Sequence, residues 1–359
     1  MKYQDGTTST STHDHHHQPL SEDDKQWLEQ ALKGAMLDLS NRMMDINNVL
    51  TDRTTTTSPA TLQEKERLLD ELMEIVESID QAKDLSTVGG LPTLLHLLSS
   101  SHPSLRWRAA EVLATCCQNN PEVQQVFFDN QVLQHLVPLL DDDTTDTTVR
   151  VKALLALSCQ IRGHTPSLSW FMNVYNGGSN GGGGIAKLVF MLKSENGGNS
   201  NSGGGDDRIV RKCLQLLDYL FLHTSSSSSS VDIRNKLIVV LTKTISSTAD
   251  VGDVRGAALQ LISTLLRCCS SSDSRAFLEQ HEGEILAAAQ SVLVKLDVLP
   301  KDEWGTAEEE AALAKKILID IQRVKNDDNL SRNREIEEEG GGDDTSAPPP
   351  PLLLSAPST

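Results

Sequence analysis

The stretch LRWRAAEVLATCCQNN, from Leu105 to Asn120, nearly recurs 44 residues on as VRVKALLALSCQIR, from Val149 to Arg162. Both copies carry apolar residues at helical spacing, with small alanines among them, and both end in polar residues. Each copy is followed by a shorter helical pattern. This repeated helical unit predicts the fold, and no catalytic motif carries comparable information.

Further helical units follow at a period of about 44 residues, stretched by insertions. No run alternates apolar and polar residues as a strand would. Helical units of roughly 40–47 residues are typical of armadillo and HEAT repeats. Since one unit cannot bury its apolar face alone, neighbouring units must stack and share a core. We therefore predict an all-α, right-handed α-solenoid of the armadillo/HEAT class with disordered tails.

The composition along the chain predicts four regions. Residues 1–24 are polar, and we expect them to be disordered. A helix and a linker follow in residues 25–60, and the repeat domain occupies residues 61–325. We expect residues 326–359, acidic and then Pro-rich, to form a disordered tail. Flexible Gly- and Ser-rich insertions are predicted at residues 177–184, 196–207 and 224–230.

The charge of the chain restricts its partners. Fifty acidic and 32 basic residues give a net charge of −18, which disfavours nucleic acid and anionic membranes as partners. The N-terminal residues show no secretory signal, and no apolar stretch is long enough to span a bilayer. The cytosol is the expected compartment, with the nucleus as the alternative.

No residue pattern predicts catalysis or a cofactor. The six cysteines form no CxxC pair, and we interpret them as small apolar residues in a reducing compartment. His13 to His17 has metal-binding side chains but lies in a predicted disordered segment. The Gly-rich runs lack the strand and the GK[ST] sequence of a phosphate loop. We predict a binding protein that is not an enzyme and needs no metal or cofactor.

Basic residues on the long helices are the candidate binding groups. In a chain this acidic, they locally invert the sign of the charge and could dock an acidic partner. The alternative is that they are solvated rim charges. The basic candidates are Arg106, Arg108, Arg150, Lys152, Arg211 and Lys212.

Three motifs resemble one family of α-solenoids. LRWRAAEVLATCCQNN, TVRVKALLALSCQIR and ESIDQAKDLSTVGGL are similar in order and spacing to the cytosolic armadillo-type nucleotide-exchange factors of Hsp70 chaperones, the Hsp70-binding-protein (Fes-type) family. The resemblance covers roughly Trp27 to Gln280 and is strongest from Leu68 to Arg162. It implies that the armadillo surface binds lobe II of the Hsp70 nucleotide-binding domain and promotes release of ADP and of substrate.

The resemblance also implies roles for individual residues. Ala82 matches a family alanine at the chaperone-contacting surface, where a bulky side chain would block docking. Lys212 matches a basic contact residue, and Arg211 takes that place if the register differs by one.

An armadillo scaffold that binds an extended peptide is the rival hypothesis. Such scaffolds present ladders of Trp and Asn, whereas Trp107 and the pair Asn119–Asn120 occur once here. The single occurrence favours the exchange factor.

Overall fold

The computed structural model describes residues 21–51, 61–141, 146–174, 183–197, 206–223, 230–247, 252–268, 271–298 and 305–340. Every regular element in these ranges is helical, and none of them is a strand. The all-α prediction is confirmed. Of the residues predicted to be disordered, 1–24 and 326–359, only 1–20 and 341–359 lie outside these ranges, as do most of the Gly- and Ser-rich insertions. Residues 22–24 already belong to a helix.

The chain divides into two compact units at Thr93/Leu94, and each is described by itself. The first unit contains α1 (Glu22–Leu50), α2 (Leu62–Ile75), α3 (Ile79–Thr87) and the start of α4 (Gly90–Leu98). Hydroxyls cap the first two helices: Ser21 accepts a hydrogen bond from the backbone of Asp24, and Thr61 accepts one from the backbone of Glu64.

Two glycines separate α3 from α4. Gly89 has φ of 78°, a left-handed conformation that ends α3 without a steric penalty. Gly90 begins α4, and a Cβ at this position would collide with the side chain of Leu85. The pair therefore allows a tight reversal with close packing.

The first half of α1 leaves large apolar side chains exposed. Trp27, Leu28 and Leu32 are 70%, 41% and 56% exposed. The second half is packed instead, with Met43 and Ile46 fully buried. Helical spacing predicted the helix correctly, but only its C-terminal half provides an apolar face that α2 and α3 cover.

The second unit repeats the predicted helical motif. Its first two repeats contain α5 (Pro103–Cys117), α6 (Pro121–Asp129), α7 (Val132–Leu136) with the short η1 (Val137–Leu140), α8 (Thr147–Ile161) and α9 (Thr165–Ser169) with η2 (Trp170–Val174). The rest contains α10 (Gly183–Gly197), α11 (Asp207–His223), α12 (Ser230–Ser247), α13 (Gly252–Cys268), α14 (Ser271–Val298) and α15 (Gly305–Gly340).

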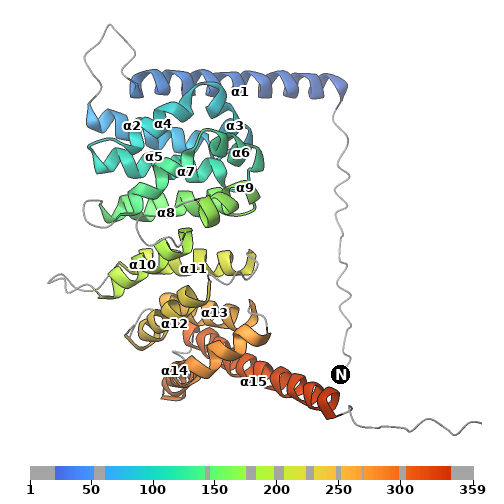
Figure 1. The fold of residues 1–359 in the computed structure, drawn as a ribbon. Coiled ribbons are helices and arrows are strands. Elements are labelled where there is room, and N and C mark those ends of the chain that lie inside the picture. Colours follow the sequence, from blue (N-terminus) through green and yellow to red (C-terminus); the bar gives the residue numbers. More distant parts are fainter. Residues whose placement is uncertain are drawn as a thin grey trace, which may run out of the picture. The chain divides into compact units, whose positions relative to one another are not determined.

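Corresponding long helices pack in chain order within this unit. α5 contacts α8, α8 contacts α11, α11 contacts α13, and α13 contacts α15 (Figure 1). Buried Ala109, Ala110, Ala153 and Ala156 allow the helices to approach closely. One apolar cluster of buried side chains extends from α7 to α15. This sharing of core between neighbours is the organisation that the repeat predicts.

The last helix is longer than the sequence indicated. We placed the start of the tail at residue 326, but α15 continues to Gly340. The extension is rich in Glu, Arg and Asn, and a charged composition indicates solvation without excluding a helix. No helix in the described part of the chain is both long enough and apolar enough to cross a membrane.

Candidate partner-binding site

Polar side chains line one side of three neighbouring helices, α5, α8 and α11. Their apolar residues face the core, so the partly exposed positions of the three helices lie next to one another. Trp107 and Glu111 come from α5, Lys152 from α8, and Arg211 and Lys212 from α11. We call this surface the long-helix face.

One aromatic ring and two cations lie close together on the α5 and α8 part of the long-helix face. The Arg108 guanidinium carbon lies 4.2 Å from the centre of the Trp107 ring, and the Lys152 ammonium lies 5.9 Å from it. Lys152 also forms an ion pair with Glu111. These contacts hold the charges of α5 and α8 in place.

The two neighbouring basic residues on α11, Arg211 and Lys212, differ in their interactions. Arg211 Nη1 lies 2.7 Å from Asp253 Oδ2, in an exposed ion pair. Lys212 forms no ion pair within the described residues. Burial lowers the pKa of Lys212, and the positive charge of Arg211 lowers it further. The Lys212 ammonium is therefore a partly desolvated cation that an incoming anion would stabilise.

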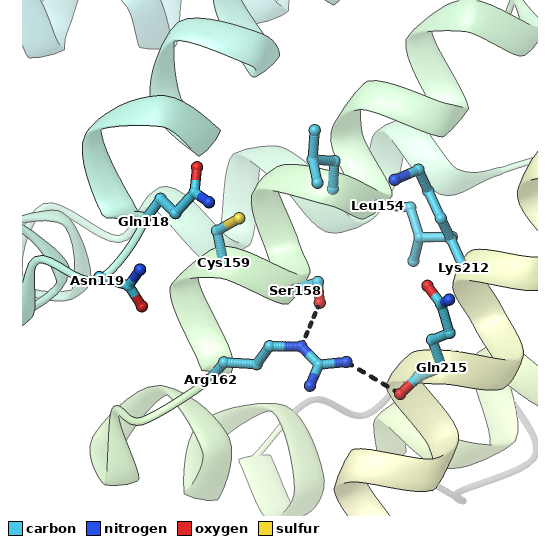
Figure 2. A pocket seen from close by; sticks show the side chains of 9 residues that line it. Gln118, Asn119, Leu154, Ser158, Cys159, Arg162, Lys212 and Gln215 are labelled. Atoms are coloured by element: carbon cyan, nitrogen blue, oxygen red, sulfur yellow. Dashed lines mark hydrogen bonds between the residues drawn. The ribbon is translucent and has the colours of Figure 1, made fainter. Parts of the chain in front are cut away.

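A pocket of about 360 Å³ opens beside Lys212 (Figure 2). Residues from the end of α5, from α8 and its C-cap, and from α11 line it. They are Gln118, Asn119, Leu154, Leu155, Ser158, Cys159, Arg162, Lys212 and Gln215. No carboxylate lines it among the described residues, so its charge is positive.

Arg162 is fixed at one edge of the pocket. Its Nε donates to Ser158 Oγ at 2.9 Å, and its Nη2 donates to the carbonyl oxygen of Gln215 at 3.0 Å (Figure 2). The guanidinium carbon also lies 4.7 Å from the centre of the Tyr219 ring. Tyr219 in turn accepts a hydrogen bond from the backbone of Gly163 at 2.9 Å. These contacts favour one orientation of the guanidinium before any partner binds.

The four cysteines whose surroundings the structure describes are not activated nucleophiles. Burial raises the pKa of the Cys159 thiol, although Lys212 and Arg162 act in the opposite direction. Burial also raises the pKa of the Cys116 and Cys213 thiols. Protonated thiols are poor nucleophiles and poor metal ligands. The described residues contain no group of three possible metal ligands, and His13 to His17 lies outside them.

The structure brings together four of the seven predicted site residues. Arg108 and Lys152 meet at Trp107, and Arg211 and Lys212 are neighbours on α11. Arg106 is only partly exposed, and its Nε is buried without a hydrogen-bond partner in the described structure.

Two predicted contact residues are buried. Arg150, predicted to point outward, is 5% exposed and forms an ion pair of 2.8 Å with Glu195. Ala82 is 1% exposed in α3, so its methyl group packs in the core of the first unit. Both predictions of an accessible side chain are wrong. Arg150 can be buried because Glu195 of α10 neutralises its charge, and such pairing is invisible in a local pattern.

Arg162 and Gln215 line the pocket but are not among the predicted site residues. One signal was available: the polar end of each repeat copy, QNN at 118–120 and QIR at 160–162, falls where successive units meet. Comparing these two ends would have placed Arg162 beside Gln118 and Asn119.

Comparisons with known proteins agree with this architecture. Residues 2–85 match the family described as nucleotide exchange factor Fes1. Residues 81–180 match the SIL1/FES1/HPBP1 C-terminal domain. The chain is a relative of the Fes1 and Hsp70-binding proteins. The resemblance noted in the three motifs is thereby confirmed.

Individual relatives show how far the similarity extends. Hsp70-binding protein 1 of Rattus norvegicus is 33% identical over 166 residues, which cover 44% of this chain and 46% of the relative. Hsp70 nucleotide exchange factor FES1 of Coccidioides immitis is 37% identical over 109 residues, which cover 30% of this chain and 51% of the relative. The chain thus spans about half the length of the curated relatives it matches.

Solved structures with a similar fold are armadillo repeat proteins. A designed armadillo repeat protein matches with a TM-score of 0.53 at 18% identity, covering 77% of this chain and 99% of the other. A computationally designed armadillo repeat protein for modular peptide recognition gives the same TM-score and identity. At this identity the likeness concerns the fold alone, and it confirms the armadillo-type α-solenoid.

Proposed function

We propose that this chain is a nucleotide-exchange factor of an Hsp70 chaperone. In this proposal the long-helix face binds lobe II of the chaperone's nucleotide-binding domain and promotes the release of ADP and of substrate. The observation that carries it is the match of residues 2–85 and 81–180 to Fes1-type families. The second of these regions contains Trp107, Arg108 and Lys152 of the long-helix face.

The mechanism needs no catalytic side chain. A protein that binds the open, nucleotide-poor chaperone more tightly than the closed one shifts the population toward the open state. Thermodynamic linkage is reciprocal. If ADP weakens the binding of this protein to the chaperone by some factor, this protein weakens the binding of ADP by the same factor. A coupling free energy of about 1–3 kcal/mol changes affinity roughly 5- to 150-fold.

The rigid α-helical scaffold supports this mechanism. A binding surface of fixed shape can favour one shape of the chaperone over the other. The Glu111–Lys152 ion pair links α5 to α8, and Arg162 links the end of α8 to α11. The long-helix face is therefore held together by contacts between successive units.

Release of a fluorescent ADP analogue from an isolated Hsp70 nucleotide-binding domain tests the proposal. We expect the stopped-flow release rate to rise with the concentration of this chain and to saturate. Replacing Arg211 and Lys212 by Glu should abolish the acceleration, whereas Lys243→Glu, on the exposed side of α12, should not. An unchanged release rate at saturating wild-type protein would contradict the proposal.

A scaffold for extended peptides is the second candidate. The chain shares its fold with designed armadillo repeat proteins, but Trp107 on the long-helix face is a single ring where such scaffolds present a ladder. Affinity capture separates the two functions, because an exchange factor retains Hsp70 and loses it on addition of ADP. A peptide scaffold retains other proteins regardless of nucleotide.

The proposed function requires no cofactor, and the proposed compartment is the cytosol. The net charge of −18 supports a protein partner over nucleic acid or a membrane surface.

A further inference from the structure

The pocket beside Lys212 has positive charge that forms no ion pair within the described residues. The two cations that flank Lys212 have carboxylate partners, since Arg211 pairs with Asp253 and Lys152 with Glu111. Lys212 and Arg162 have none among the described residues. The two unneutralised cations come from different helices and border the same pocket.

The rest of the lining suits a carboxylate on a short aliphatic stem. Leu154 and Leu155 supply an apolar wall, and the carboxamides of Gln118, Asn119 and Gln215 supply hydrogen-bond donors. Asn119 reaches the pocket because its φ of 55° turns the chain sharply at the end of α5 (Figure 2).

The guanidinium of Arg162 is already oriented by contacts within the chain. Its contacts with Ser158, Gln215 and Tyr219 fix the guanidinium before binding. The conformational entropy that a free arginine would lose on pairing has therefore already been lost on folding. The guanidinium is planar and has N–H donors left over after these contacts.

We propose that this pocket is a subsite for an acidic side chain of the protein partner, an Asp or Glu whose carboxylate pairs with Lys212 and Arg162 and whose methylene groups lie against Leu154 and Leu155. The inference rests on the proposed function, with the chaperone domain as the partner. It adds Arg162 and the end of α5 to the binding surface.

Binding of the Hsp70 nucleotide-binding domain to the full chain tests the subsite. Lys212→Gln and Arg162→Gln should each raise the Kd about tenfold or more, because each removes a charged hydrogen-bond donor. Lys243→Gln, the matched loss of one positive charge, should leave the Kd within about twofold of wild type. Circular dichroism establishes that each variant is folded.

Alkylation of Cys159 measures occupancy of the pocket directly. Cys159 lines the pocket and is partly exposed, whereas Cys116, Cys117 and Cys213 are buried. Saturating nucleotide-binding domain should slow iodoacetamide labelling of Cys159 in proportion to the occupied fraction. Hexaglutamate should protect Cys159 better than hexaglutamine at matched ionic strength, and the Lys212→Gln/Arg162→Gln double variant should lose this protection.

The outcomes separate the two proposals. If the domain binds with equal Kd to wild type and to both pocket variants, the subsite is wrong and the exchange function stands. If the domain does not bind the wild-type chain, the exchange function is wrong. The labelling of Cys159 in the presence of hexaglutamate and of hexaglutamine then decides whether the pocket binds a carboxylate. Equal labelling of Cys159 in hexaglutamate and hexaglutamine would then overturn it.

Discussion

The burial of Ala82 makes it a core residue of the first unit, where the resemblance implied a contact residue. The residue is 1% exposed within α3, so an arginine there would have to displace core side chains or bring a charge into the core. We expect Ala82→Arg to lower the free energy of unfolding by at least about 2–3 kcal/mol. Thermal and urea melts followed by circular dichroism measure this loss.

Thr87→Arg provides the control, because Thr87 is exposed at the end of the same helix. It should leave the melting transition close to that of wild type. A melt of Ala82→Arg that coincides with wild type would show that α3 can expose this position. Ala82 would then be accessible to a partner.

The charge of Lys212 makes the stability of the chain depend on pH. Its pKa is lowered by burial and by Arg211, so the folded state releases this proton at a lower pH than the unfolded state. Between the two pKa values the folded state binds fewer protons, and the free energy of unfolding therefore rises with pH. Below both values the full penalty of the desolvated ammonium is present.

Lys212→Met should accordingly stabilise the chain near neutral pH. The gain over wild type should shrink as the pH approaches about 10.5, the ordinary value for lysine. Urea titrations of both proteins at about pH 7.5 and about pH 10 measure the difference, and Lys243→Met controls for the loss of one surface charge. A gain that grows with pH would contradict the assigned direction of the pKa shift.

The charged residues of the site were only partly predictable. Helical spacing shows which side of a helix is polar, and on that basis Lys152 and Lys212 were found. The partner of each charge comes from a different helix: Glu111 for Lys152 and Glu195 for Arg150. Whether a basic residue is free, paired or buried is decided by these distant carboxylates, which the local pattern does not contain.

At the scale of helices, one buried amide network joins two consecutive repeats. Gln124 of α6 donates to the carbonyl oxygens of Cys159 and Arg162 at 2.6 and 2.8 Å, at the end of α8. Gln160 donates to the carbonyl oxygen of Gln124 at 2.7 Å and to Ser167 Oγ at 2.8 Å. The network thus satisfies carbonyl groups that the end of α8 would otherwise leave unpaired.

Gln124→Leu should destabilise the chain by about 1–3 kcal/mol, because it leaves two carbonyl groups without their donor. Gln134→Leu is the matched control, since Gln134 is exposed on α7. Urea denaturation of both variants measures the difference. Equal stability of the two variants would mean that water replaces the amide of Gln124.

Helix boundaries in this chain coincide with local sequence signals. Pro103 begins α5, Asn120 with Pro121 begins α6, and Gly89 separates α3 from α4. Burial was harder to predict. The apolar residues in the first half of α1 have helical spacing but remain exposed, since burial requires a covering element as well as an apolar face.

At the scale of the whole molecule, stacking of units predicts that unfolding is not a single transition. Each long helix packs against its neighbours in the chain, and the contacts of α13 are with α11, α12, α14 and α15. Stability of such an array is a sum of local terms and nearest-neighbour terms. A core substitution should therefore lower the free energy of local unfolding most in the helices that surround it. In a single cooperative domain the substitution would lower the stability of all helices together.

Paired substitutions in the two compact units test this directly. Leu69, in α2, and Ile262, in α13, are both completely buried, and truncation to Ala should cost about 2–5 kcal/mol at either site. By hydrogen exchange with mass spectrometry, Leu69→Ala should accelerate exchange in α2 and α3 and leave α13 and α15 at wild-type rates. Ile262→Ala should do the reverse. Equal acceleration throughout the chain in both variants would show one cooperative unit, and the nearest-neighbour account of this solenoid would then fail.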